Sequence, residues 1–247
     1  MNNLVIDIGN TAIKYAIFGD DDSMLCNGRI ENHADIQPIK NDCNIFHPDN
    51  AIVASTADLS EGVISNIRAL TPHTLLLDHN TPVPIENLYH TPHTLGTDRL
   101  AAAIAAYNQT HSNTLIIDIG TAITIDFVNA DGQYLGGNIS PGMHLRFETL
   151  HEHTAHLPLV SHEGAKPEFG VDTETAIRCG VINGINYEIQ GYISEFSLKY
   201  HNLCIFLTGG DQIYFDEAIK NRIFADKYLV LKGLNEIIKF NLHCKHS

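Results

Sequence analysis

Three aspartates, Asp7, Asp118 and Asp126, each interrupt an otherwise apolar run of the sequence. An ionised carboxylate is costly to remove from water unless it gains a partner. Carboxylates gathered at one place suit hard cations such as magnesium or potassium, which prefer oxygen ligands. Alternatively, each carboxylate lies at a strand end and bonds nearby turn amides. A single such aspartate would not distinguish cation binding from hydrogen bonding to turn amides. The sequence around two of the three aspartates, however, is repeated.

Residues 4–18 (LVIDIGNTAIKYAIF) and 115–128 (LIIDIGTAITIDFV) share the order apolar run, Asp-Ile-Gly, polar turn with Thr, apolar run. They differ by one turn residue, because Asn10 has no counterpart. Runs rich in β-branched residues indicate strands, and glycine allows the chain to reverse. Weak alternation favours strands that are covered on both faces. Each copy therefore predicts a β-hairpin that opens its own α/β unit, and facing hairpins would bring Asp7 and Asp118 toward a shared cleft.

The first hairpin also carries groups that could bind phosphate. Residues 9–11 (Gly-Asn-Thr) offer backbone N–H groups that can form an anion-binding nest. Thr11 adds a hydroxyl and Lys14 a positive charge, although Lys14 could instead be an edge-strand residue whose ammonium reaches water. Neither GxxxxGK[ST] nor a kinase-type GxGxxG is present. Phosphate binding would therefore use the hairpins.

Asp118 follows Asp7 by 111 residues, a plausible length for a small domain. We predict a mixed α/β chain of two similar domains, residues 1–112 and 113–247, that meet near residues 110–114. Outside the hairpins, apolar patterns and helix-start residues predict further elements. The expected strands are 51–56 and 203–208, and the expected helices are 60–70 (with Ser60 as N-cap), 98–108, 174–198 and 212–222, with a short helix and loop in 31–50.

The composition excludes some classes of function. The 247 residues include 29 acidic and 15 basic side chains, so the formal net charge is −14. An acidic protein repels nucleic acid and anionic membranes at long range. Five scattered cysteines without a CxxC pair indicate a reduced, cytoplasmic protein, and we expect no signal peptide and no membrane span. The densest histidine group, His151, His153 and His156, is expected to be a solvated surface.

Five segments match one family in the right order and together cover most of the chain. On these segments the sequence resembles type III pantothenate kinases, within the acetate/sugar kinase–Hsp70–actin superfamily. The segments are residues 7–14 (DIGNTAIK), 89–99 (YHTPHTLGTDR), 118–126 (DIGTAITID), 136–142 (GGNISPG) and 170–173 (GVDT) with Ala176 and Ile177.

This resemblance implies two ribonuclease H-like domains, the duplication of actin-like ATPases, with an ATP cleft between them. It implies ATP-dependent phosphorylation of pantothenate to 4′-phosphopantothenate, the first step of coenzyme A biosynthesis. The implied cofactors are Mg²⁺ with ATP and a monovalent cation, K⁺ or NH₄⁺. The implied assembly is a homodimer with pantothenate and ATP as its small-molecule partners.

The resemblance also implies roles for particular residues. Asp98 would be the general base, Asp7 would hold magnesium directly or through water, and Asp118 would bind the monovalent cation. Pantothenate would contact Tyr89, Gly96, Thr97, Asp98, Arg99 and, from the neighbouring subunit, Thr173. ATP phosphates would contact Asp7, Ile8, Gly9, Asn10, Thr11, Ala12, Ile13, Lys14 and Thr121.

Asp98 is expected at a helix N-terminus, where the helix dipole favours the ionised carboxylate. Such a carboxylate is a weak base, but phosphoryl transfer passes through a loose transition state in which positioning matters more than basicity. The structural alternative is that Asp98 only caps the helix.

Two other functions remain open at the level of sequence. Another small-molecule kinase of the superfamily would share the fold. A non-catalytic nucleotide-binding regulator could keep the hairpins but would be expected to lose Asp98 or Arg99, and both are present. No sharp motif marks the adenine pocket.

Overall fold

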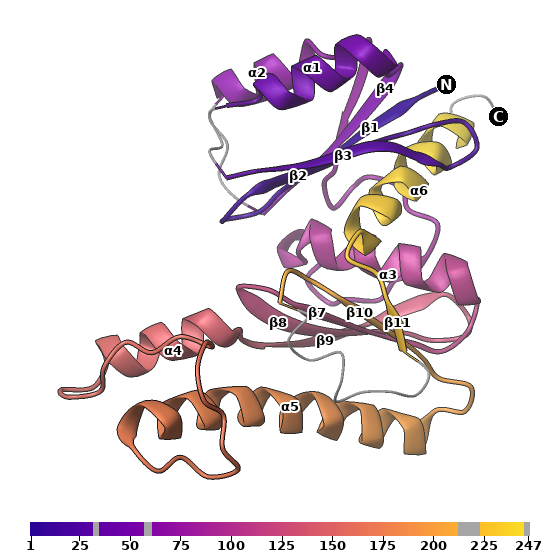
Figure 1. Cartoon of the computed structure of the whole chain (residues 1–247). Coiled ribbons are helices and arrows are strands. Elements are labelled where there is room, and N and C mark those ends of the chain that lie inside the picture. The colour runs from indigo at the N-terminus through magenta and orange to yellow at the C-terminus, as the bar shows by residue number, and fades with distance from the viewer. Residues whose placement is uncertain (32–34, 57–60, 212–222, 245–247) are drawn as a thin grey trace. The chain divides into compact units, whose positions relative to one another are not determined.

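The protein is described by a computed structural model that covers residues 1–31, 35–56, 61–211 and 223–244. The chain forms two compact units, each described by itself (Figure 1). Unit 1 is Met1–Gln109 with Gly132–Tyr134 and Tyr228–Ser247, and unit 2 is Thr110–Asp131 with Leu135–Lys227. The units are therefore not two consecutive segments. The domain boundary expected from the duplication, at residues 112 and 113, stays a prediction.

Unit 1 is built on a five-stranded sheet of order β3-β2-β1-β4-β5. The strands β1, β2 and β3 are antiparallel neighbours, whereas β4 and β5 run parallel to β1. The elements are β1 (Asn3–Ile8), β2 (Ile13–Phe18), β3 (Met24–Ile30), α1 (Gln37–Phe46), β4 (Asn50–Ser55), α2 (Glu61–Arg68), β5 (His73–Leu76), β6 (Glu86–Asn87), a 3₁₀ turn (Pro92–Thr94), α3 (Thr97–Thr110) and α6 (Leu229–Cys244).

Strand β1 is covered on both faces, as predicted, and all six of its residues are buried. Side chains alternate between the faces of a strand. Leu4, Ile6 and Ile8 belong to the apolar cluster that includes residues of α1 and α2. The other face, which carries Asn3, Val5 and Asp7, packs against α6 at its Asn3 end.

Unit 2 holds most of a six-stranded sheet of order β11-β10-β7-β8-β9-β6. Read from β9 to β11, it repeats the strand order of unit 1, with an antiparallel β7–β8 hairpin and β10 and β11 parallel to β7. The elements are β7 (Thr114–Ile119), β8 (Ala122–Val128), β9 (Gln133–Pro141), α4 (Met143–Glu152), α5 (Thr173–Lys199), β10 (Cys204–Thr208) and β11 (Ile223–Ala225).

The two predicted hairpins are confirmed, and their turns correspond closely. In β1–β2 the N–H of Gly9 donates to the carbonyl of Ala12 over 3.1 Å. In β7–β8 the N–H of Gly120 donates to the carbonyl of Ala122 over 3.0 Å. The second loop is one residue shorter, as the missing counterpart of Asn10 predicts.

The strands expected at 51–56 and 203–208 and the helices expected at 60–70, 98–108 and 174–198 are all present, with bounds within a few residues. A helix also lies within 31–50, whereas Ser60 and the helix expected at 212–222 lie outside the described residues. His151, His153 and His156 are exposed, as expected. No helix in the described part of the chain is both long and apolar enough to cross a bilayer.

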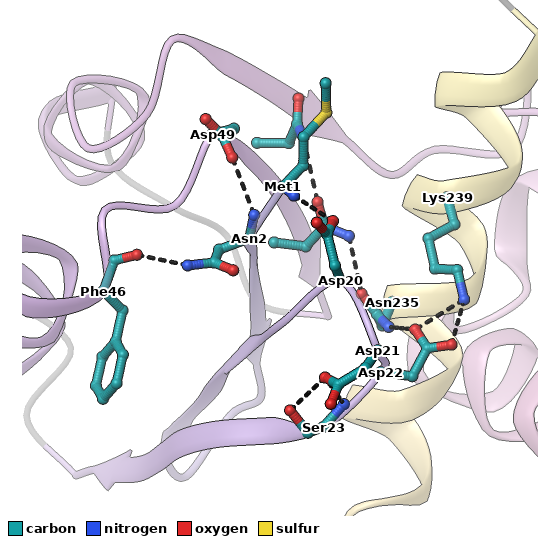
Figure 2. A network of polar contacts seen from close by, with 12 residues as sticks. Met1, Asn2, Asp20, Asp21, Asp22, Ser23, Phe46, Asp49, Asn235 and Lys239 are labelled. Atoms are coloured by element: carbon teal, nitrogen blue, oxygen red, sulfur yellow. Dashed lines mark hydrogen bonds and ion pairs between the residues drawn. The ribbon is translucent and has the colours of Figure 1, made fainter.

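A buried amide network fixes α6 to the sheet of unit 1. Asn3, Asn50 and Asn235 are 5%, 3% and 2% exposed. The amide of Asn235 donates to Asp22 over 3.0 Å, and Asn235 accepts from the amide of Asn3 over 3.1 Å. Lys239 donates to both oxygens of Asp22 (Figure 2). Since buried polar groups are stable only when paired, this network specifies where α6 docks.

We predict that Asn235→Ala lowers the free energy of unfolding by about 1–3 kcal/mol, because it leaves the buried amide of Asn3 without its acceptor. Urea unfolding followed by circular dichroism measures this change. The matched control is Asn241→Ala on the same helix, whose amide bonds Pro82 and Ile237 nearer the surface and whose loss should cost less than about 1 kcal/mol. Equal losses for the two variants would contradict the account.

Candidate active site

The first hairpin places a carboxylate beside a cation. Asp7 and Lys14 are directly opposite in the β1–β2 register, so their side chains share a face with Cβ atoms about 5 Å apart. Asp7 is 6% exposed and Lys14 is half-buried. The edge-strand interpretation of Lys14 is wrong, because β2 lies between β3 and β1. A cation held in the sheet beside a buried carboxylate fits a binding role better than a solvated one.

The second hairpin surrounds its carboxylate with hydroxyl groups instead. Asp118 is paired with Thr124 on β8 and with Thr208 on β10. In the first copy, the equivalent neighbours of Asp7 are Lys14 and Ala54. Asp126, which is 1% exposed, lies on the same face as Asp118, since it pairs with the residue two positions earlier in β7. This face is rich in oxygen atoms.

A pocket of about 380 Å³ lies in unit 1, where β4 and β5 end and α3 begins. In open α/β sheets, ligands bind outside the carboxyl ends of such parallel strands. Ser55 is in register with Ile8, and the N–H of Thr56 donates to the carbonyl of Ile8 over 3.0 Å. The pocket therefore borders the strand that ends in the Asp7 hairpin. Its lining residues are Ser55, Thr56, Asp78, His79, Pro92, His93, Thr94, Leu95, Gly96 and Thr97.

Asp98 follows this lining in the first turn of α3. Its Oδ1 accepts the N–H of Arg99 over 2.8 Å, so the capping alternative describes one of its contacts. A Cβ added at Gly96 would lie 2.5 Å from that Oδ1. Glycine at 96 thus leaves room for the carboxylate to turn back toward the pocket wall. The hydroxyl oxygen of Thr97 is buried and has no hydrogen-bond partner among the described residues.

Tyr89 and Arg99, ten residues apart in sequence, meet in space. The guanidinium carbon of Arg99 lies 5.9 Å from the centroid of the Tyr89 ring, within the range of a cation–π contact. Arg99 is 7% exposed, and the ring of Tyr134 lies 6.2 Å from that of Tyr89. The two ends of the segment 89–99 are therefore close in space, with the guanidinium of Arg99 near the ring of Tyr89.

The sequence analysis missed several residues of the pocket. Ser55 and Thr56 end β4, and Asp78 and His79 follow β5, so polar residues directly after apolar runs were the available signal. The rings of His79 and His93 lie 6.4 Å apart in an edge-on arrangement. The hydroxyl of Thr81 donates to Asp78 over 3.0 Å and lowers the pKa of that carboxyl below its ordinary value.

In unit 2, Thr121 lies exposed at the tip of the second hairpin, where α4 begins. The N–H of Gly142, the N-cap residue of α4, donates to the carbonyl of Thr121 over 2.9 Å. A Cβ at residue 142 would lie 2.0 Å from the carbonyl oxygen of Gly120, so no larger residue fits without moving the turn. The segment 136–142 therefore supports the hairpin that carries Asp118.

Thr173 lies exposed at the first position of α5. The preceding residue, Asp172, accepts the N–H of Thr175 over 2.8 Å, and the hydroxyl of Thr175 bonds back to this N-cap. This capping box satisfies donors that a helix start leaves free. The backbone N–H of Thr175, and then its hydroxyl, lower the pKa of Asp172 below its ordinary value.

Comparison with solved structures identifies the fold. A protein from Campylobacter jejuni described as a Baf family transcriptional activator aligns with a TM-score of 0.64 and 22% identity, over 97% of this chain and 99% of that one. The activator of 2-hydroxyisocaproyl-CoA dehydratase from Clostridium difficile, with bound ADPNP, aligns with a TM-score of 0.58 and 12% identity, over 100% and 98%. These likenesses, with the repeated strand order, define the duplicated fold of actin-like ATPases and sugar kinases.

Sequence comparison is more specific. A family model for type III pantothenate kinase matches residues 3–195. A type III pantothenate kinase of Bacteroides fragilis is 49% identical over 240 residues, which are 97% of this chain and 98% of the relative. The chain belongs to the type III pantothenate kinase family.

We predict that Gly142→Ala lowers the free energy of unfolding by about 2 kcal/mol or more, because the added methyl displaces the Gly120–Thr121 turn. The control is Gly180→Ala in α5, where an added Cβ meets no atom within 4 Å. That change should stabilise the protein by up to about 1 kcal/mol through helix propensity. Thermal unfolding compares the two, and a Gly142→Ala protein as stable as the parent would contradict the close approach.

Proposed function

We propose that this chain transfers the γ-phosphoryl group of ATP to the primary hydroxyl of pantothenate, the first step of coenzyme A biosynthesis. Membership of the type III pantothenate kinase family carries this proposal. The local geometry supports it, since the buried Asp7, with Lys14 in register opposite it, and the polar pocket beside Asp98 both border the end of strand β1.

The first hairpin would hold the phosphates of ATP. Its turn, residues 9–12, presents N–H groups, the exposed side chains of Asn10 and Thr11, and the nearby ammonium of Lys14. Asp7 would hold Mg²⁺ directly or through water, which neutralises charge that develops on the phosphates. The residues Asp7, Ile8, Gly9, Asn10, Thr11, Ala12, Ile13 and Lys14 form the proposed phosphate-binding set of this hairpin, and the resemblance adds a role for Thr121 in unit 2.

Asp98 would act as the general base for the acceptor hydroxyl. As the oxygen of pantothenate bonds to the γ-phosphorus and ADP leaves, the hydroxyl proton passes to the Asp98 carboxylate. The adjacent pocket would hold the rest of the acceptor, with the Thr97 hydroxyl free to bond it. Its volume of about 380 Å³ suits a small molecule. Arg99, held against Tyr89, would bind the substrate carboxylate as a planar fork.

The surroundings of Asp118 favour a monovalent cation there. The threonines beside it on β8 and β10 supply oxygen atoms where the first hairpin supplies an ammonium and a methyl group. Oxygen ligands around a carboxylate suit a hard cation such as K⁺ or NH₄⁺. Asp7 would thus face the covalently attached ammonium of Lys14, whereas Asp118 would face an ion that exchanges with the solution.

A homodimer in the cytoplasm completes the proposal. Phe169 and Val171, close to Thr173, are 77% and 85% exposed. Exposed large apolar side chains mark interaction sites when they are contiguous. A second copy of the chain that covered these side chains would bring the pantothenate bound to that copy next to Thr173. The free thiols fit a reducing compartment. The net charge of −14 disfavours nucleic acid as a binding partner.

A nucleotide-binding regulator is the alternative, and the description of the Campylobacter jejuni structure gives it a specific basis. A coupled assay with pantothenate, ATP, Mg²⁺ and K⁺ separates the two. Turnover of pantothenate supports the kinase. Turnover of glucose or acetate in its place would reassign the substrate, and no turnover with intact ATP binding would favour the regulator.

We predict that Asp98→Asn lowers kcat by about 10²-fold or more, in line with general-base contributions, and leaves the affinity for ATP within about twofold. The control is Asp78→Asn, which changes a carboxylate of the same pocket that Thr81 already engages; its kcat should fall far less. Near-normal turnover by Asp98→Asn would remove Asp98 from the mechanism.

We also predict that replacing K⁺ by Na⁺ lowers kcat/KM by about tenfold or more, because the smaller Na⁺ needs shorter distances to the same oxygen ligands. Thr124→Val, which removes one hydroxyl beside Asp118, should raise the K⁺ concentration for half-maximal activity. Indifference of both proteins to the cation would argue against a site at Asp118.

A further inference from the structure

Residues 153–172, here called the strap, connect α4 to α5 without regular secondary structure and lead directly to Thr173. Leu157 and Val160 anchor its first half in the apolar core of unit 2. Its second half, which includes the exposed Phe169 and Val171, has little apolar burial of its own. Besides the capping box of Asp172 and Thr175, a further contact must therefore hold the strap where it leads toward Thr173.

Arg178, one and a half turns into α5, supplies that contact. It is 7% exposed, its Nε donates to the carbonyl of Ser161 over 2.9 Å, and its Nη1 donates to the carbonyl of Ala165 over 3.3 Å. A carboxylate oxygen of Glu174 lies 3.9 Å away, but Glu174 is 68% exposed, so screening weakens this pair. The buried guanidinium is thus held mainly by strap carbonyls.

Two glycines show how closely the strap follows the helix. Gly164 has φ of +112°, and a Cβ there would lie 3.0 Å from Cζ of Arg178. A Cβ at Gly170 would lie 2.2 Å from Cα of Ala176. The thiol of Cys179 also donates to the carbonyl of Pro167 over 3.1 Å. The strap is therefore bound to α5 at several points, with Arg178 at the centre of its turn.

We propose that Arg178 is a positioning residue for the kinase reaction: by holding the strap carbonyls it sets the place of Thr173, and so the affinity for pantothenate. This inference rests on the proposed function and on the role of Thr173 in it. Lysine cannot replace Arg178, because an ammonium is a single point donor, whereas the guanidinium spans two carbonyls in a fixed plane. A small displacement of a substrate-contacting group is enough to lower affinity and rate substantially.

The test is a double-mutant cycle between Arg178→Lys and Thr173→Ala in the full-length chain, with KM for pantothenate, KM for ATP and kcat as readouts. Arg178→Lys should raise the KM for pantothenate about tenfold and leave the KM for ATP within about twofold. In the Thr173→Ala background the same change should have less than a twofold effect, since the position of a missing hydroxyl no longer matters.

Two controls separate positioning from general loss of stability. Ile189→Val in α5 removes a fully buried methyl far along the helix and should lower Tm without any selective change in KM. Glu174→Gln removes the weak ion pair and should change neither KM. If Arg178→Lys does not fold, Gly164→Ala takes its place, because its methyl pushes on the guanidinium from the strap side.

Equal effects of Arg178→Lys in both backgrounds, or a parallel rise in both KM values, would overturn the inference. An unchanged KM for pantothenate in Arg178→Lys, when Thr173→Ala is impaired, would also overturn the inference. The proposed function would stand in that case. A wild-type protein that does not phosphorylate pantothenate, or a Thr173→Ala variant with normal KM, would instead refute the proposed function or its use of Thr173.

Discussion

A carboxylate at the end of a buried strand is the constraint on which this structure depends. Asp7 is 6% exposed and is the last but one residue of a strand whose other five residues are also buried. Such a group keeps its charge only with compensating partners. The sheet places Lys14 in direct register opposite it, and the hairpin turn adds backbone N–H groups. The apolar face of the same strand packs on α1 and α2, which holds the carboxylate in place.

The duplicated hairpin of unit 2 also carries a carboxylate near a strand end, but a different type of side chain lies opposite it. Both hairpins keep the bond that closes the turn, but the partner of the carboxylate differs: lysine in the first copy, threonine in the second. A covalently attached cation cannot leave, whereas hydroxyl oxygens can receive an ion from solution. The two copies therefore have the same backbone and different electrostatics, and under the proposed function this asymmetry would let one hairpin bind phosphate and the other a monovalent ion.

The sequence predicts features that depend on neighbours in the chain. The hairpins follow from β-branched runs and glycine turns, and the helix at Asp98 follows from its alanines. The resemblance assigns Tyr89 and Arg99 to one substrate, and that role stays a prediction; their mutual approach, with the guanidinium carbon 5.9 Å from the ring centroid, is a finding of the structure. The residue pattern of one segment therefore predicts only the secondary structure that this segment itself determines.

Features set by distant contacts could not be predicted. The docking of α6 depends on a hydrogen bond between residues 232 apart in sequence, Asn3 and Asn235. His93 and Thr94 line the pocket only because two parallel strands and the start of α3 converge. The buried guanidinium of Arg178 bonds backbone carbonyls, which have no sequence signature. Each of these features depends on which distant segments become neighbours in the fold, and a single sequence does not show that.

Binding of Mg²⁺-ATP to Asp7→Asn, measured by isothermal titration calorimetry against the parent protein, tests the central claim most directly. The variant keeps the size of the side chain and one of its two acceptor oxygens, and it removes the charge. The account predicts that affinity for Mg²⁺-ATP falls at least tenfold, about 1.4 kcal/mol, while affinity for ATP without divalent metal changes little. Unchanged Mg²⁺-ATP affinity in a folded variant would contradict the role given to the buried carboxylate.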